Sequence, residues 1–178
     1  MKLYLVRHGE TDWNVEYRAQ GYTDIPLNPN GIAQAEKLRD DIKNRGLRFD
    51  AVYSSPLQRT LKTAQIITDG QYDLILDDRL KERNLGELEG KVVEDWGQFG
   101  VDLFDPQLNA NAFNVEPIRD FQERTESFLD ELRQEYPRDA RILVVTSNGY
   151  MKRIHFILCN DYRDIPKFHN AEIYEYDI

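Results

Sequence analysis

The segment ILVVTSNGYMKR, residues 142–153, joins a short apolar run to a helix-like pattern through the polar sequence TSNG (146–149). In open α/β proteins, ligands bind where a strand leads into a tight turn and then a helix. No side chain of this turn titrates near neutral pH. The segment is therefore either one wall of a ligand site whose titratable groups lie elsewhere in the chain, or only a connection.

The composition predicts a single globular domain over residues 1–178, since 178 residues with 40% hydrophobic residues suffice for one core. The longest apolar runs are about four residues, far below the ~20 that a membrane-spanning helix needs. An apolar strand begins at residue 3, which leaves no room for a cleavable signal sequence, and the single cysteine cannot form an internal disulfide. We therefore expect a cytoplasmic protein.

The net charge of −9 argues against nucleic acid or an anionic membrane as a partner. In such an acidic chain, a local cluster of arginines is a stronger indication of a functional site. No pattern in the sequence indicates an oligomeric state.

Strand-like and helix-like segments alternate along the chain. The expected strands are 3–6, 49–55, 73–78, 141–147 and 171–178. The expected helices are 31–46, 56–68, 117–137 and 150–159, with a further short helix near 92–99. This alternation predicts a three-layer α/β/α fold with a mostly parallel central sheet. Right-handed crossovers then bring the ends of strands 3–6, 49–55 and 141–147 to one edge.

Arg7, His8 and Gly9 follow the first expected strand directly. Burying Arg and His unpaired at a strand end would cost much free energy. Gly9 allows the backbone to turn closely around a ligand, and an imidazole there can act as nucleophile, general base or metal ligand. No second His, Cys or carboxylate lies at ligand spacing, which argues against a metal.

Arg59 lies in the first turn of the helix that follows the second expected strand. Backbone N–H groups of such a turn favour anions. Arg7 and Arg59 thus converge from two strand ends, and phosphate suits the fork geometry of two guanidinium groups. The alternative is that Arg59 pairs with a surface carboxylate.

Glu82 follows the third expected strand by a few residues, at the same edge. The negative charge of a phosphoryl group favours the protonated form of a neighbouring carboxyl group, which can then act as general acid. By contrast, we expect Glu87 and Glu89 to face solvent or cap turns.

Four blocks of the chain, in the right order, resemble the histidine phosphatase superfamily, also called phosphoglycerate mutase-like. The blocks are LYLVRHGETDWN (3–14), RAQGYTDIPLNPNGIAQAEKL (18–38), VYSSPLQRTLKTAQ (52–65) and LKERNLGELEG (80–90). The resemblance implies that His8 attacks phosphorus and forms a phosphohistidine. Glu82 would protonate the leaving oxygen and then activate water, while Arg7 and Arg59 stabilise the equatorial oxygens.

The resemblance also implies a small phosphorylated ligand and no metal or organic cofactor. The positions that match the family's pocket lining are Asn14, Gln20, Gly21 and Thr23. Cofactor-dependent mutases of the family carry a long insertion, whereas here Glu82 and Ser147 are only 65 residues apart. This favours a phosphatase over a mutase. Segment 101–117 replaces the insertion and is a lid, a specificity wall or an unconstrained loop.

The last block departs from the family, which has a second histidine facing the first across the phosphate. The alignment leaves a choice of one residue, so Ser147 or Asn148 takes the place of this histidine, and Gly149 is a further expected substrate contact. Either side chain donates only a neutral hydrogen bond. This predicts a weakened phosphatase, with mutase-type phosphotransfer or a pseudoenzyme that only binds phosphorylated ligands as the alternatives.

Two other histidines are candidates to compensate. His155 lies about two helical turns, or ~10 Å, beyond Asn148, and we expect it to be structural. His169 precedes a segment that resembles a pocket-lining block, Asn170-Ala171, and is a possible additional phosphate contact.

Overall fold

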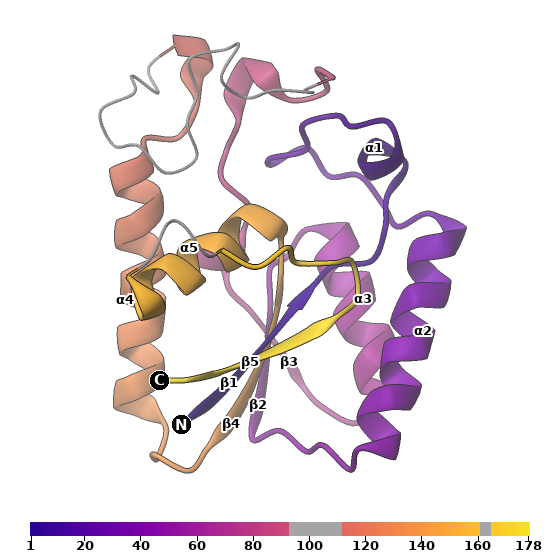
Figure 1. Ribbon diagram of the computed structural model, residues 1–178, viewed down its shortest axis with the longest axis vertical. Helices are drawn as coiled ribbons and strands as arrows, with labels where there is room; N and C mark the ends of the chain where they lie inside the picture. Colours follow the sequence, from indigo (N-terminus) through magenta and orange to yellow (C-terminus); the bar gives the residue numbers. More distant parts are fainter. Residues whose placement is uncertain (93–111, 161–164) are drawn as a thin grey trace.

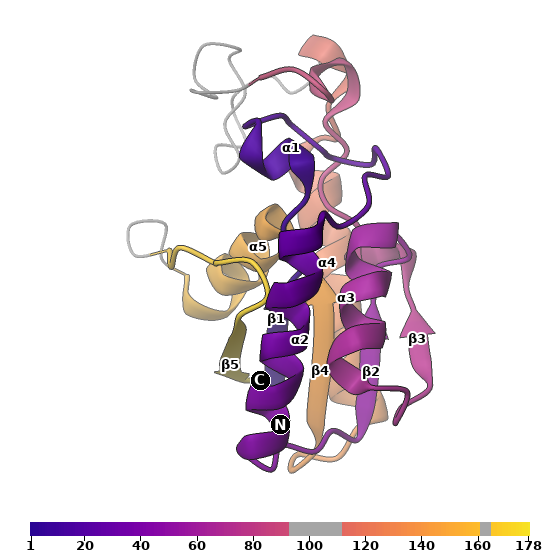
Figure 2. The ribbon, with the colours of Figure 1, turned by 90° about the vertical axis from the view of Figure 1, so that its right-hand side faces the viewer.

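In the computed structural model, which describes residues 1–92, 112–160 and 165–178, a sheet of five strands forms the centre (Figure 1). The strands are β1 (Lys2–Arg7), β2 (Ala51–Ser54), β3 (Leu74–Leu76), β4 (Arg141–Thr146) and β5 (Ile173–Asp177), in the order β3-β2-β4-β1-β5. The first four are parallel, and β5 runs antiparallel to β1 at one edge. Figure 2 shows β3 and β5 at opposite edges of the sheet. The predicted mostly parallel sheet is confirmed.

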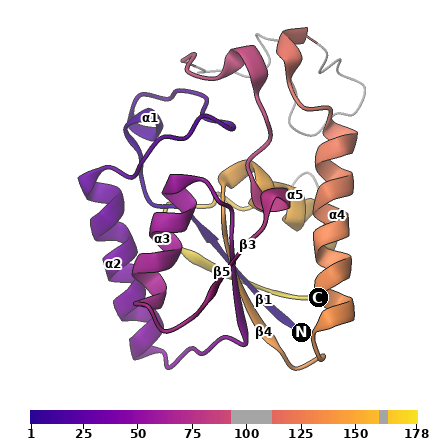
Figure 3. The same ribbon diagram turned by 180° about the vertical axis from the view of Figure 1, so that it is seen from behind.

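Helices cover both faces of this sheet, as the α/β/α prediction requires. On one face lie α2 (Pro29–Asn44) and α3 (Gln58–Thr68), and on the other α4 (Ile118–Glu135) and α5 (Asn148–Cys159) (Figure 1, Figure 3). Alternate residues of β1 and β4 enter the two apolar cores, because successive strand side chains point to opposite faces. The buried residues of α4 recur at helical spacing along its length, at Ile118, Phe121, Thr125, Phe128, Leu129 and Leu132.

Short elements lie beyond the carboxyl ends of the parallel strands. They are α1 (Asp12–Val15), η1 (Asp78–Leu80), η2 (Gly86–Leu88) and η4 (Ala112–Asn114). In Figure 1, α1 and the segment after β3 both lie past these strand ends. No helix within the described ranges is long and apolar enough to cross a membrane.

The pairing of β1 with β4 sets two site segments side by side. Arg7 is the partner of Thr146 in the parallel register, and the His8 N–H donates a 3.0 Å hydrogen bond to the Thr146 carbonyl. His8 and Ser147 therefore leave the sheet at the same level, on neighbouring central strands.

Several element boundaries differ from the sequence prediction. α3 begins at Gln58 instead of 56, because Leu57 has extended backbone (φ −63°, ψ 139°) and occupies the N-cap position. α5 begins at Asn148, two residues earlier than expected. Ile32, an apolar residue of the expected helix 31–46, is 37% exposed on α2. Residues 93–99 of the expected short helix and residues 101–111 of the segment 101–117 lie outside the described residues.

Gly9 meets a helix backbone, whereas we expected it to make room for a ligand. A Cβ atom on Gly9 would lie 2.4 Å from the carbonyl oxygen of Gly31, and one on Gly31 would lie 2.1 Å from that of Glu10. The start of α2 therefore packs against the loop after β1 at backbone contact distance. Two glycines make this approach possible, and it fixes the path of the chain just beyond His8.

Candidate active site

A cavity of about 150 Å³ lies at the carboxyl ends of β1 and β4. Nine of the residues predicted for the site line it, namely Arg7, His8, Asn14, Gln20, Gly21, Arg59, Glu82, Ser147 and Asn148. Three further lining residues, Arg18, Ala19 and Leu85, were not predicted. Residues from five separate parts of the chain thus meet in one small polar cavity.

His8 is neutral and its tautomer is fixed. Its side chain is buried, and Nδ1 lies 2.7 Å from the Gly9 carbonyl oxygen. Since that oxygen only accepts hydrogen bonds, Nδ1 carries the proton and Nε2 keeps its lone pair. Burial, and then the positive charges of Arg59 and Arg7, hold the pKa of His8 well below its usual value of 6.5. An unprotonated Nε2 is the form that a nucleophile requires.

The segment before β5 holds the backbone of His8 in place. Asn170 Nδ2 donates a 2.8 Å hydrogen bond to the His8 carbonyl, and the Ala171 N–H donates one of 2.9 Å to the Arg7 carbonyl. The Gly9 N–H donates to Thr63 Oγ1 of α3 at 3.0 Å. For Asn170, the signal in the sequence is the resemblance of its segment to a pocket-lining block.

The guanidinium groups of half-buried Arg7 and fully buried Arg59 line the cavity with donors to spare. Arg7 Nη1 donates to the Phe168 carbonyl at 2.9 Å, and burial lowers the pKa of Arg7. In the described part of the chain, Nε of Arg7 and Nε of Arg59 are buried without a hydrogen-bond partner. Buried donors of this kind are almost always satisfied, so both Nε groups have a donor available for a ligand or for water.

Arg59 does not pair with a surface carboxylate, the alternative left open by the sequence. Its side chain is fully buried and donates to the carbonyl oxygens of Gly21 at 2.7 Å and Thr23 at 2.9 Å. Burial lowers the pKa of Arg59. Arg59 therefore both lines the cavity and anchors the loop 20–23 that closes one side of it.

Glu89 holds the same loop from the other side, consistent with the expectation that it caps a turn. Its carboxylate accepts hydrogen bonds from the backbone N–H groups of Tyr22 at 2.8 Å and Thr23 at 2.7 Å. The Thr23 hydroxyl also donates to Glu89, and Thr23, expected at a pocket-lining position, is not among the residues that line this cavity. Gly21 has φ of 53°, and a Cβ there would lie 2.1 Å from Glu89 Oε1.

Glu82 is held by two backbone N–H groups. Its Oε1 accepts from Arg83 at 2.8 Å and its Oε2 from Gly149 at 2.8 Å. Arg124 of α4 binds the carbonyl oxygens of Lys81 at 2.8 Å and Glu82 at 2.9 Å, which fixes the backbone of this segment. Gly149, predicted as a ligand contact, does not line the cavity and instead positions Glu82.

The first turn of α5 forms the remaining wall. Ser147 occupies the N-cap position without a capping hydrogen bond from its side chain, and its Oγ is buried without a partner among the described residues. Asn148 is half-buried. Backbone N–H groups at a helix start favour anions. Both side chains line the cavity, so the structure leaves open which one takes the position of the second histidine.

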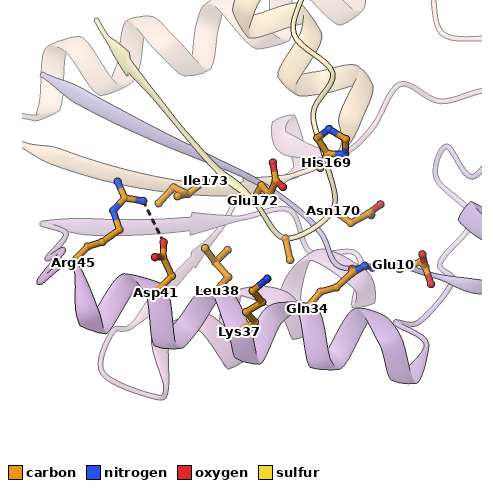
Figure 4. Close-up of a pocket in the computed structure, with 11 residues that line it drawn as sticks. Glu10, Gln34, Lys37, Leu38, Asp41, Arg45, His169, Asn170, Glu172 and Ile173 are labelled. Atoms are coloured by element: carbon orange, nitrogen blue, oxygen red, sulfur yellow. Dashed lines mark hydrogen bonds and ion pairs between the residues drawn. The ribbon is translucent and has the colours of Figure 1, made fainter.

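The two remaining histidines lie away from this cavity. His169 is exposed and lines a separate groove of about 680 Å³ between α2 and residues 169–173 (Figure 4). The expectation that it reaches the phosphate is therefore not supported. His155 is buried, with Nδ1 2.9 Å from the Tyr176 hydroxyl oxygen, in agreement with the structural role predicted for it.

Arg18 adds a third guanidinium group to the rim of the cavity. It donates to the Gly90 carbonyl at 2.8 Å and forms an ion pair with Glu16 at 2.5 Å. The signal that could have identified it is its position two residues before Gln20, at the start of the second block.

A neutral imidazole, buried guanidinium groups and a helix start around one cavity define an α/β protein with an anion-binding site suited to phosphate. The family model of the histidine phosphatase superfamily (branch 1) matches residues 3–178. The chain therefore belongs to the histidine phosphatase superfamily.

Its relatives include both phosphatases and mutases. The uncharacterized phosphatase PhoE of Bacillus subtilis is 36% identical over 155 residues, which cover 86% of this chain and 74% of PhoE. A 2,3-bisphosphoglycerate-dependent phosphoglycerate mutase of Mesorhizobium japonicum is 32% identical over 161 residues, covering 85% of this chain and 78% of the mutase.

Solved structures of both kinds also match. A mutant phosphoserine phosphatase from Entamoeba histolytica, in complex with phosphoserine, superposes with a TM-score of 0.81 at 29% identity, covering 98% of this chain and 89% of that one. A phosphoglycerate mutase from Thermus thermophilus superposes with a TM-score of 0.75 at 30% identity, covering 99% and 93%.

Proposed function

We propose that this protein is a phosphomonoester hydrolase that works through a phosphohistidine at His8. The observation that carries the proposal is the His8 imidazole, which is neutral, has Nδ1–H bonded to Gly9 and lies in one cavity with Arg7 and Arg59. The arginines bind the phosphoryl oxygens, and Nε2 is the nitrogen free to attack.

In the first step, His8 Nε2 attacks phosphorus and the bond between phosphorus and the ester oxygen breaks. Glu82 gives its proton to the leaving oxygen, so an alcohol departs. Arg7 and Arg59 stabilise the negative charge on the equatorial oxygens, which is the largest contribution available to a phosphoryl transfer site.

In the second step, Glu82, now a carboxylate, takes a proton from a water molecule that attacks the phosphohistidine. The bond between phosphorus and Nε2 breaks, and inorganic phosphate leaves. Glu82 is protonated again and His8 is neutral again, so the cycle closes without a metal or an organic cofactor.

The short interval between Glu82 and Ser147 supports hydrolysis over mutase-type transfer between hydroxyl groups. To separate the two, the protein is incubated with phosphoserine or a phosphoglycerate, and inorganic phosphate and phosphoglycerate isomers are measured in the same samples. We expect phosphate release that is lost in the His8→Ala variant. Isomerisation without phosphate release would instead identify a mutase.

A protein that binds phosphorylated ligands without turnover is the second candidate. The neutral side chains of Ser147 and Asn148 favour it, because neutral hydrogen bonds are roughly half as strong as charge-assisted ones. Measurable phosphate binding with neither phosphate release nor isomerisation would support this second candidate.

A further inference from the structure

Lys152 is a cation beside the phosphate cavity that the mechanism above does not use. It lies on α5, four residues after Asn148, which lines the cavity. Residues four apart share one face of an α-helix and are separated by about one turn, ~6 Å along the axis. Lys152 and Asn148 therefore occupy the same face of α5.

The direction of helical side chains brings the Lys152 ammonium toward the cavity. Long side chains in a helix point back toward its N-terminus and cover the preceding turn. The preceding turn of α5 is the one that holds Asn148 and Gly149, and the Gly149 N–H is bonded to Glu82. The four-carbon stem of lysine spans a distance of this size.

The electrostatic surroundings of Lys152 belong to the same site. Its side chain is half-buried, α5 packs beside β1, and the charged groups that act on its ammonium are Glu82 and Arg7. Burial lowers the pKa of Lys152, the Glu82 carboxylate raises it, and the Arg7 guanidinium lowers it again. Glu82 and Arg7 both line the cavity, whereas Lys152 is not among its lining residues, so its ammonium lies beside the cavity, within the electrostatic reach of both residues.

We propose that Lys152 binds the phosphoryl group from the α5 side of the cavity and supplies there the positive charge that neither Ser147 nor Asn148 carries. This inference rests on the phosphate site of the proposed function. Its consequence is that the pocket surrounds the phosphoryl group with cations from β1, α3 and α5, although the α5 turn itself is neutral.

The test measures the affinity for inorganic phosphate and for orthovanadate by titration calorimetry. Lys152→Met removes the charge and keeps an unbranched apolar stem, Lys152→Arg keeps the charge, and Lys62→Met removes an exposed lysine of α3 as a matched control. A charge-assisted contact predicts that Lys152→Met weakens binding by about 10- to 100-fold. Lys152→Arg and Lys62→Met should stay within about 3-fold of the wild type.

A second readout separates charge from structure. Lost phosphate contacts reduce the dependence of affinity on salt concentration, so Lys152→Met should show a shallower dependence than the wild type. Lys152→Gln repeats the measurement with a polar side chain, should Lys152→Met fail to fold. Wild-type affinity and an unchanged salt dependence in both neutral variants would overturn the proposal, as would a wild-type protein that binds neither anion.

The outcome is independent of turnover. A protein that forms phosphohistidine and binds phosphate equally well without Lys152 contradicts the role of Lys152 and leaves the hydrolase proposal intact. Conversely, weaker phosphate binding in Lys152→Met, in a protein that never phosphorylates His8, contradicts the hydrolase proposal and supports the role of Lys152.

Discussion

The backbone N–H of Gly149 donates a 2.8 Å hydrogen bond to Oε2 of Glu82. This bond joins the first turn of α5 to the segment after β3, which supplies the proposed general acid. The turn that lacks the second histidine of the family therefore still has a structural task. It holds the carboxyl group that, in the proposed mechanism, delivers a proton to the leaving oxygen.

Gly149→Ala tests this task of the turn. A Cβ at this position would lie 2.2 Å from Glu82 Oε1, so the carboxyl group has to move. Alanine is favoured over glycine within a helix by about 1 kcal/mol, so global unfolding is not the expected effect. We expect kcat to fall by about 10²-fold or more, as when a general acid is lost, with little change in phosphate affinity.

Glu82→Gln is the matched variant for that experiment, since it removes the proton donor with a side chain of nearly the same size. Its amide oxygen can still accept one of the two backbone hydrogen bonds from Arg83 and Gly149, whereas its NH2 group cannot accept the other. Steady-state kinetics with a phosphomonoester and calorimetry with phosphate should give similar losses for both variants. Wild-type kcat in Gly149→Ala would show that the position of Glu82 does not limit the reaction.

Arg59→Lys should lower kcat/KM and the melting temperature together. Lysine cannot donate to the Gly21 carbonyl, the Thr23 carbonyl and a phosphoryl oxygen in the fixed fork geometry of a guanidinium group. Loss of one preorganised donor costs about 10²–10³ in rate, and each buried carbonyl left without a donor costs about 1–3 kcal/mol of stability. Kinetics and thermal unfolding measure the two effects.

Arg45→Lys is the control for Arg59→Lys, because Arg45 is an exposed arginine that pairs with Asp41 at the end of α2. Arg45→Lys should leave both kcat/KM and the melting temperature near their wild-type values. An Arg59→Lys variant that matches this control would contradict the anchoring and phosphate-binding roles of Arg59.

Asn148→His should raise turnover if Asn148 takes the position of the missing histidine. The new imidazole donates a charge-assisted hydrogen bond, which is roughly twice as strong as a neutral one. Ser147→His tests the other register with the same side chain at a position that is 1% exposed. A gain in kcat for Ser147→His alone would assign the position to Ser147, and no gain in either variant would contradict the expectation that a cation is missing from this turn.

The stability of the protein should depend on pH through His8. The folded state holds the pKa of His8 well below 6.5, whereas in the unfolded chain it returns to about 6.5. As the pH falls, the unfolded state therefore binds the extra proton first. The contribution of His8 to the free energy of unfolding is fully present above pH ~6.5 and is lost as the pH falls toward the pKa of His8 in the folded state. The loss is at most about 1.4 kcal/mol per pH unit.

Urea unfolding at several pH values between roughly 5 and 7 measures this slope. His8→Ala should remove its contribution, so that the difference in unfolding free energy between wild type and variant shrinks as the pH falls. Parallel curves for the two proteins would mean that His8 titrates normally in the folded state.

Much of the fold follows from local sequence patterns. The apolar runs of β1 and β4 are bounded by polar turns, a pattern that is typical of buried strands. The apolar residues of α4 have helical spacing over 18 residues, which indicates a helix. Parallel strands then bring Arg7, His8 and Ser147 to one edge without knowledge of any distant contact. Arg59 and Glu82 follow the second and third expected strands and were placed at the same edge for that reason, whereas the cavity-lining positions 14, 20 and 21 came from the resemblance to the family's motifs.

The errors concern side chains whose partners lie far away in the sequence. Thr23 turns to Glu89, 66 residues away, and Gly9 meets the backbone of Gly31. His169 lines a groove together with Gln34 and Leu38 of α2, which are far away in the sequence. No local pattern encodes these contacts, since each depends on how two loops pack after the sheet has formed.

The central claim is that His8 is a nucleophile, and covalent labelling tests it most directly. The protein is incubated with a phosphomonoester labelled in the phosphoryl group, quenched in alkali, and divided between alkaline and acidic treatment before the labelled peptide is mapped. We predict a label on His8 that survives alkali, is lost in acid and is missing from His8→Ala. No label on His8 in a protein that binds phosphate, or the same label in His8→Ala, would contradict the account.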